Sequence, residues 1–490
     1  MHDLPDVVWR IVVDYLRPSF EGDNYLLRGS RFPSESECAC LATLARLCRV
    51  SSRHRAFAER ALYHSVPAAA RPAAQSRLFA VLQRRPDLAR HVRALYVEED
   101  CLSRVEFAVL VRNPARAMAA ARPRQPAVAR LAEQIAALGD DLPDFSWAFY
   151  DAWCAYMVTL MPGLEFLDIT MSNMATLMPS LIRDAARDSE EEKEKKKNEG
   201  DRDIQASGTI SVPAATEFMS RPLSRLEGIC IRWPDETRGA LQMRLIQDVL
   251  LLPRLERFHG VCVDLNTRLT TGRTLRGSLS PPKSSNVRDV ILDYSLVEAD
   301  GLLDLLRTCP LLQKLSIGWA DWDVGESALD WEGFGNALRE HGSNLEFLNL
   351  DCRECSEYET GDWGDTIGDL SGLQRLQYLS LPHDVLLGNK RGVPTNPYDE
   401  DVDSEESEDV NDGPDLRLEP LLPRSLKSLL LYCVYDVHSW IHRAAKGLIS
   451  SQRLPQLRCV ELNNDKVYVT RTPFDTNPYE ANPYDSDLYE

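Results

Sequence analysis

The chain has 490 residues, twelve cysteines and a net charge of −19. Its length exceeds what one compact core holds, so the sequence predicts several domains or a repeat array. The longest apolar run is shorter than a membrane helix needs, and the acidic N-terminal segment is unlike a secretion signal. We therefore expect a cytoplasmic or nuclear protein with no membrane partner. Residues 1–130 hold 21 Arg and no Lys against 13 acids, so a basic head precedes an acidic body, which argues against a nucleic-acid partner for the body.

The first 66 residues predict a small head of three helices. Residues 4–16 carry apolar side chains on one broad helical face, and residues 40–66 carry two further apolar stripes. Pro5 lies near the first turn, where its missing N–H costs little. Because a unit of this size is small for an independent fold, we expect its helical faces to pack on a neighbour.

The head resembles an F-box domain, particularly the form found in fungal F-box/leucine-rich-repeat-like proteins. The residues that match its motif are Leu4, Pro5, Ile11, Leu16, Leu44, Leu47, Cys48, Val50, Arg53, Arg55, Phe57 and Leu62. Two features depart from the family: the link over residues 17–39 is longer and more polar than in a typical F-box, and His54 stands where many members have Trp.

The resemblance implies that the head docks on the Skp-type adaptor of a cullin–RING ubiquitin ligase, while the repeats hold a protein substrate. The adaptor-binding residues that it implies are Leu4, Pro5, Val8, Ile11, Leu16, Leu44, Leu47, Cys48 and Val50. Docking of this kind is a helix face burying apolar anchors in a partner groove.

Residues 67–160 are expected to form a helical linker with a first repeat-like unit at Val92, Leu95 and Val97. From residue 161 to residue 465 the pattern L-x-x-L-x-L recurs. Its copies begin at Leu164, Leu226, Val287, Leu312, Leu345, Leu376, Leu426 and Leu457, with an imperfect copy at Leu255 where Gly260 replaces the third apolar residue. The alternating part predicts a short strand with one face toward the core.

Apolar residues at helical spacing between the copies predict covering helices within residues 239–253, 297–310, 328–341 and 436–450. The predicted fold class is therefore α/β: a three-helix F-box-like head and an irregular leucine-rich-repeat solenoid of about nine or ten units. Its parallel strands would line the concave face and its helices the convex face. A doubly wound α/β domain also alternates strands with helices, but it does not explain the Leu three positions before each strand.

Two charged insertions interrupt the array, at about 183–215 and 388–416, and their composition predicts disorder. The tail over residues 466–490 is predicted to be disordered too. It carries Asn-Pro-Tyr at 477–479 and 482–484, which repeats residues 396–398 of the second insertion. These copies are either turn formers or a short linear motif.

The sequence lacks the motifs of the common enzyme classes, including HExxH, GxSxG and the phosphate-binding glycine loops. Cys38 and Cys40 form one close pair and Cys352 and Cys355 another, but neither has a second pair at zinc-ligand spacing. We therefore expect no enzymatic activity, no metal and no cofactor. An α/β hydrolase is the remaining alternative in the enzyme class, and it would need a clustered nucleophile and base.

The sequence thus predicts a substrate-recognition adaptor of an SCF-type ubiquitin ligase. The alternative is a leucine-rich-repeat scaffold for protein interactions with no ubiquitin role, in which the head only caps the repeats. Side chains between the apolar strand positions would face the substrate. They are Glu165, Asp168, Glu227, Arg288, Gln313, Lys314, Glu346, Asn349, Gln377, Lys427, Arg458 and Glu461. This row mixes both signs of charge and does not define the substrate.

Overall fold

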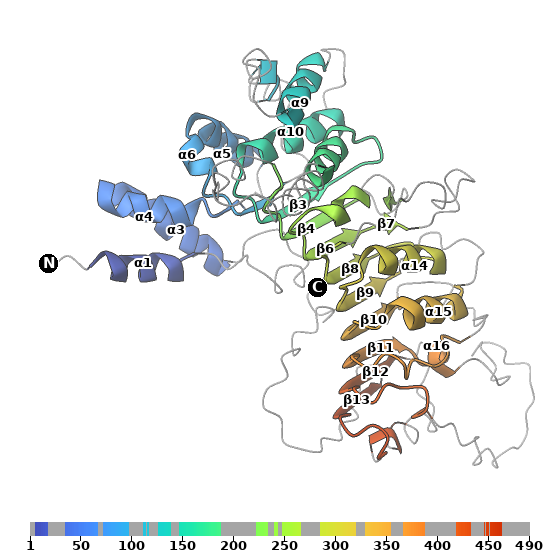
Figure 1. The fold of residues 1–490 in the computed structure, drawn as a ribbon. Helices are drawn as coiled ribbons and strands as arrows, with labels where there is room; N and C mark the ends of the chain where they lie inside the picture. The colour runs from blue at the N-terminus through green and yellow to red at the C-terminus, as the bar shows by residue number, and fades with distance from the viewer. Residues whose placement is uncertain are drawn as a thin grey trace, which may run out of the picture. The chain divides into compact units, whose positions relative to one another are not determined.

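The computed structural model describes most of the chain, in segments. They are residues 5–17, 35–66, 72–97, 111–113, 115–116, 126–138, 147–187, 222–233, 240–243, 247–265, 285–319, 329–353, 366–387, 418–432, 445, 447–449 and 451–462. The chain forms two compact units (Figure 1). Unit 1 comprises Met1–Pro234, Arg244–Glu256 and Pro483–Glu490, and unit 2 comprises Asp235–Met243 and Arg257–Asn482.

Unit 1 begins with three helices, as the apolar stripes predict: α1 (Asp6–Tyr15), α3 (Glu35–Val50) and α4 (Ser52–Leu62). Pro5 lies just before α1 and has no N–H to leave unpaired. Ser51 separates α3 from α4, and its hydroxyl accepts the backbone N–H of His54 at 3.2 Å. This N-cap satisfies a donor that the first turn of α4 would otherwise leave free.

The rest of unit 1 surrounds four parallel strands that follow chain order: β1 (Ser65–Val66), β2 (Ala94–Tyr96), β3 (Phe166–Thr170) and β4 (Gly228–Arg232). Around them lie α5 (Pro72–Arg84), α6 (Pro86–Ala89), α9 (Pro126–Ala137), α10 (Trp147–Leu160), a helix over residues 177–187 and the 3-10 helix η3 (Gln247–Leu251). Helix α10 is apolar on every side and buries ten consecutive residues, which makes it the centre of the unit.

The main sheet of unit 2 contains seven parallel strands among the described residues, again in chain order: β6 (Arg257–Val261), β8 (Asp289–Asp293), β9 (Lys314–Gly318), β10 (Phe347–Asp351), β11 (Tyr378–Pro382), β12 (Ser428–Tyr432) and β13 (Cys459–Leu462). The repeat positions pair in register, so that Leu315 lies beside Leu348 and Leu348 beside Leu379. A second sheet pairs β5 (Leu241–Gln242) with β7 (Val263–Asp264).

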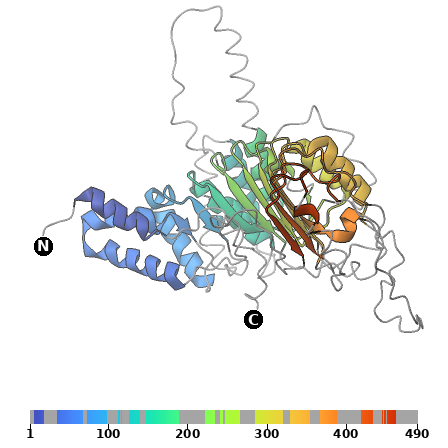
Figure 2. The ribbon, with the colours of Figure 1, turned by 90° about the horizontal axis from the view of Figure 1, so that it is seen from below.

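Helices cover one face of the main sheet of unit 2 (Figure 2). They are α14 (Ala299–Thr308), α15 (Trp331–His341) and the short α16 (His383–Leu387). The apolar strand residues point toward them, and Trp319, Trp331 and Phe334 are buried in the shared core. The two Trp rings meet edge to face, and the Phe334 ring is tilted against both. Each repeat therefore shares its core with its neighbours in the stack, which is how a solenoid gains stability.

Every predicted copy of the repeat contains a strand, including the unit around Leu95 and the imperfect copy that begins at Leu255. At Gly260 the structure explains the missing side chain. The chain bends at Cys262, whose φ is +56°, and brings Val263 back over the glycine. A Cβ on Gly260 would lie 2.7 Å from Cγ2 of Val263, closer than carbon atoms pack.

Three details differ from the sequence-based expectations. The predicted helix within residues 239–253 is confirmed only in part: β5 forms first, where the N–H of Leu241 donates to the carbonyl of Cys262. Met243 is helical, residues 244–246 lie outside the described residues, and η3 is a 3-10 helix. The helix over residues 177–187 continues past residue 183, where we expected the first insertion to begin. Residues 188–215, the second insertion and the tail lie outside the described residues. The strand β1, which ends the head, was not predicted.

Candidate functional site

The head has a small core of its own. Val13 of α1, Leu44 of α3, and Ala58 and Ala61 of α4 are buried together, with five partly buried side chains around them: Leu16, Leu47, Cys48, Phe57 and Leu62. Burial raises the pKa of the Cys48 thiol, so this residue stays protonated and behaves as an apolar filler. These residues hold the three helices together.

Polar and aromatic contacts fix α1 against α4. The Arg53 guanidinium donates two hydrogen bonds to the Asp6 carboxylate, the shorter one at 2.6 Å. Trp9 packs edge to face on His54, with ring centroids 4.4 Å apart. His54, the residue that departs from the family pattern, therefore has an aromatic partner on α1. The orientation of α1 about its axis is determined by these contacts and by Val13.

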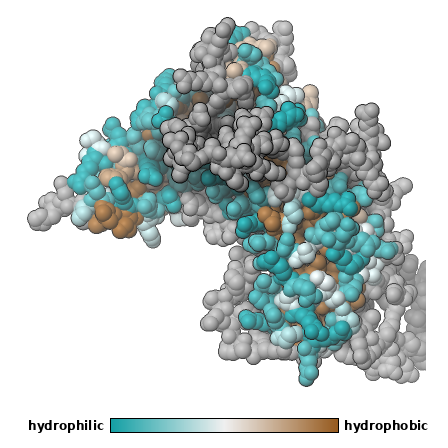
Figure 3. Space-filling model, in the orientation of Figure 1, coloured by the Kyte–Doolittle hydropathy of each residue, from teal (hydrophilic) through white to brown (hydrophobic). Residues whose placement is uncertain are grey.

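This orientation leaves one side of α1 apolar and exposed. Val7, Ile11 and Tyr15 are four residues apart and remain 66%, 63% and 88% exposed, and Val12 beside them is 37% exposed. Residues at this spacing lie on one face of a helix. We call these four residues the α1 apolar stripe; Figure 3 shows apolar surface gathered at the end of the head where Figure 1 places α1.

The structure separates the predicted adaptor-binding residues into two groups. Leu44 is fully buried, and Leu16, Leu47 and Cys48 pack around the head core, so these side chains hold the head together and offer little or no surface to a partner. Pro5, Ile11 and Val50 are exposed and Val8 is half-buried, while Leu4 lies outside the described residues. Sequence reasoning missed Val7, Val12 and Tyr15 as surface residues. Their signal was that residues 4–16 are apolar over more of the helix than one core can cover.

Strand pairing and ion pairs connect the head to the repeats. β1 follows α4 after only two residues and pairs with β2 in parallel register. Arg85, just before α6, contacts Asp87 at 2.7 Å and reaches Glu59 of α4 at 3.3 Å. These exposed pairs contribute little stability by themselves. The backbone pairing therefore makes β1 both the last element of the head and the first strand of the sheet.

The predicted substrate-facing residues differ in what the structure leaves accessible. Asp168 is fully buried and holds the Arg232 guanidinium through both oxygens at 3.2 Å, and Asn349 is 7% exposed and donates to Ser316. Both side chains are engaged within the sheet. Glu227, Arg288 and Arg458 are exposed, and the others are half-buried: Glu165, Gln313, Lys314, Glu346, Gln377, Lys427 and Glu461.

Aromatic side chains accompany these residues on the sheet face opposite the helices of unit 2. Phe347 and Tyr378 on neighbouring strands stack with centroids 4.4 Å apart, and the Arg353 guanidinium lies over the Tyr432 ring at 5.5 Å. Burial raises the pKa of Tyr378 to about 12. Aromatic and Arg side chains are those that most often anchor protein interfaces. The leucine pattern alone does not predict this cluster.

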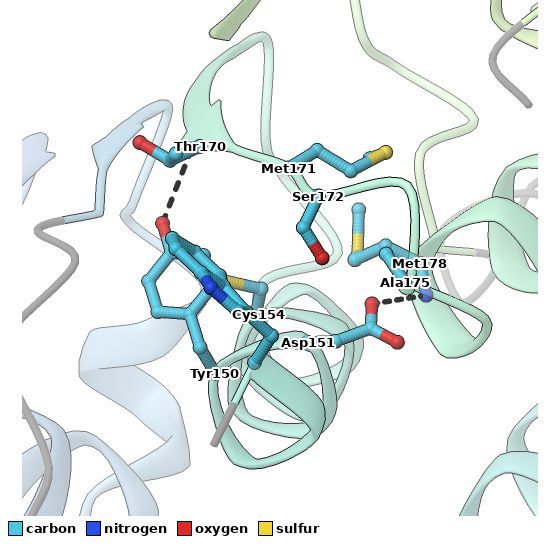
Figure 4. Close-up of a pocket in the computed structure, with 9 residues that line it drawn as sticks. Tyr150, Asp151, Cys154, Thr170, Met171, Ser172, Ala175 and Met178 are labelled. Carbon is cyan, nitrogen blue, oxygen red and sulfur yellow. Dashed lines mark hydrogen bonds between the residues drawn. The ribbon is translucent and has the colours of Figure 1, made fainter. Parts of the chain in front are cut away.

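A pocket in unit 1 is lined by residues of α10 and of the chain after β3 (Figure 4). Asp151 is almost fully buried there, and its carboxylate accepts the backbone N–H groups of Thr176 and Leu177 at 2.7 Å and of Met178 at 2.9 Å. Burial raises the pKa of this carboxyl against the opposing effect of the three donors. Since these donors begin the helix over residues 177–187, Asp151 acts as its N-cap from a distant part of the chain.

In unit 2, Nε2 of His259 lies 2.7 Å from the Asp293 carboxylate, and the His259 ring is nearly buried. His259 of β6 lies beside Ile291 of β8, so Asp293 is two positions further along the neighbouring strand. Across the part of the chain that the structure describes, no three His, Cys, Asp or Glu side chains group as metal ligands, and no helix is long and apolar enough to cross a membrane.

No protein-family model matches the chain, and no curated protein matches it. Among solved structures, one match is the crystal structure of a TLR13–ssRNA13 complex, at 15% sequence identity and a TM-score of 0.30. The match covers 62% of this chain and 30% of the length of the TLR13 chain. A likeness this low carries no inference, so the fold rests on the strand pairing described above.

Proposed function

We propose that this protein is a non-catalytic substrate adaptor of a cullin–RING ubiquitin ligase, in which the head docks on a Skp-type adaptor and the repeats hold a protein substrate. The observation that carries the proposal is the α1 apolar stripe. Val13 and Leu44 are buried in the core of the head, whereas Val7, Ile11 and Tyr15 remain exposed on one helix face. An exposed apolar helix face next to a self-sufficient core is typical of a docking surface.

The size of the stripe sets the expected effect of removing it. Burying an exposed Val or Ile side chain completely contributes about 1.5–3 kcal/mol. Val7 and Ile11 together then contribute about 3–6 kcal/mol to docking, which corresponds to roughly 10²–10⁴-fold in affinity. Replacing both by Asp also leaves two charges against an apolar groove, so the loss is expected at the upper end.

The test is co-purification of the full chain with the Skp-type adaptor. Val7→Asp with Ile11→Asp is expected to abolish co-purification, while the matched variant Val81→Asp with Met174→Asp retains it, because those two side chains are exposed apolar residues outside α1. Circular dichroism of both variants checks that the helices persist. Unchanged capture of the adaptor by the α1 variant would refute the proposal.

A second candidate function rests on β1. This strand lies at the edge of the sheet in unit 1, and edge strands left bare promote aggregation. A head that only caps the sheet would belong to a repeat scaffold with no ubiquitin role. Under that alternative, the full chain would not bind the adaptor. Deletion of residues 1–66 would make the remaining chain insoluble, whereas deletion of residues 1–63, which keeps β1, would leave it soluble.

A further inference from the structure

Lysine is absent from the first 192 residues of the chain. This stretch contains 23 Arg and no Lys, whereas the remaining 298 residues contain 23 Arg and 10 Lys. A uniform preference for Arg over Lys along the chain does not produce this division. The missing lysines therefore belong to one part of the protein, the part that comprises the head and nearly all the described elements of unit 1.

The structure does not require Arg at many of these positions. Arg53 and Arg85 each make paired contacts with a carboxylate, a geometry that an ammonium group does not reproduce. Four others lie exposed on helix surfaces, and none has an ion pair with a described residue: Arg46 and Arg49 on α3, and Arg77 and Arg84 on α5. On an exposed helix face Lys is as good a helix former as Arg, and it carries the same charge. Fold stability does not explain its absence there.

Lys and Arg differ in a property that matters to a ubiquitin ligase. The neutral ε-amine of Lys attacks the thioester carbonyl that links the C-terminus of ubiquitin to its carrier enzyme. An amide bond forms, the amine loses a proton, and the carrier's thiol leaves. The Arg guanidinium stays protonated throughout the physiological range and is not a nucleophile. A head rich in Arg keeps its positive charge without offering an acceptor.

The two lysines among the described residues both lie outside the head and unit 1. Lys314 and Lys427 belong to unit 2 and are both half-buried. The ammonium group of Lys427 donates to the side-chain oxygen of Gln377 at 2.7 Å. In the described part of unit 1, no surface amine from a lysine side chain is present at all.

We propose that the head and unit 1 are kept free of lysine so that the ligase, while holding this chain, does not ubiquitinate it there. This inference rests on the proposed function, because only a chain docked on the ligase brings this surface close to the carrier enzyme that holds ubiquitin as a thioester. Self-modification would then be confined to residues beyond 192, where all ten lysines lie.

The test introduces acceptors at exposed positions. The full chain carrying Arg46→Lys, Arg49→Lys, Arg77→Lys and Arg84→Lys is compared with wild type and with a control in which the same four residues become Gln. Each is assembled with the Skp-type adaptor, cullin–RING, carrier enzyme, activating enzyme, ubiquitin and ATP, without substrate. Modified positions are located by mass spectrometry, and discharge of ubiquitin onto free lysine confirms that each assembly is active.

The Lys variant is expected to gain ubiquitin at the introduced residues and to self-modify several-fold faster than wild type and the Gln control, which remain unmodified within residues 1–192. Introduced lysines that stay unmodified in a variant that binds the adaptor, with active discharge, would overturn this inference alone. A wild-type chain that fails to bind the adaptor would overturn the proposed function and this inference with it.

Discussion

Asp151 provides a direct test of the packing of unit 1. The perturbation is Asp151→Ala, compared with Asp151→Asn. The carboxylate accepts three backbone N–H groups at the start of the helix over residues 177–187, at 2.7 Å, 2.7 Å and 2.9 Å. A buried donor left without a partner costs about 1–3 kcal/mol. Allowing for partial relaxation of the helix start, Asp151→Ala is expected to destabilise unit 1 by about 3–6 kcal/mol, a large fraction of a typical domain's stability of about 5–15 kcal/mol.

Asp151→Asn retains one oxygen, and therefore a partner for Thr176 and Leu177, but it turns an N–H donor toward the N–H of Met178. The expected cost is about 1–3 kcal/mol, smaller than for Ala. The pH dependence adds a second signature. Burial raises the pKa of Asp151 in the folded state, so the folded protein holds its proton more tightly than the unfolded chain. Stability therefore falls as the pH rises from the ordinary value of 3.8 through the raised pKa.

The assay is urea unfolding followed by circular dichroism over that pH range, with hydrogen exchange of residues 177–187 as the local measurement. The Asn variant should lose the pH-dependent fall that wild type shows. A change below about 0.5 kcal/mol for Asp151→Ala, the range of an ordinary surface substitution, with unchanged protection of that helix, would refute the role assigned to this carboxylate.

Two further predictions concern unit 2. Gly260→Ala should lower the melting temperature, because its Cβ would lie 2.7 Å from Val263 and overpacking costs about 1–3 kcal/mol. Gly372→Ala is the control, since a Cβ there meets nothing within 4 Å. Equal melting temperatures for the two variants would contradict this reasoning. Tyr378→Phe should remove one tyrosinate whose absorbance titrates at about 12. Because that pKa is raised above the ordinary 10.0, the free energy of unfolding of the wild type should fall more steeply than that of the Phe variant between pH 10 and about pH 12. If the two free energies depended on pH in the same way, Tyr378 would be exposed to solvent.

The sequence predicted the repeats well because their signal is strong and local. Each apolar pair that alternates along a strand, such as Leu348 and Leu350, must face the core, and a shift by one residue would expose both. The helices α14 and α15 were predicted for the same reason, since their apolar residues recur at helical spacing. Leu241 and Gln242 belong to a segment with a similar spacing yet form β5, because their backbone pairs with β7 after Cys262. The same segment is helical over residues 247–251, but as the 3-10 helix η3.

The candidate docking surface was harder to predict. The family resemblance grouped Leu44 with Ile11, although one fills the head core and the other is 63% exposed. An apolar face as broad as that of α1 does not reveal from its sequence which of its residues face inward. Here the contacts of Asp6 with Arg53 and of Trp9 with His54 set that orientation, and both join residues more than forty positions apart.

The central claim is that the head docks through α1, and hydrogen exchange of the full chain with and without the Skp-type adaptor tests it most directly. Amides that open by local unfolding become protected when a partner covers their helix. We predict strong additional protection of residues 5–17 on adding the adaptor, with no change over residues 418–462 of unit 2. Unchanged exchange of residues 5–17 at saturating adaptor would contradict the claim.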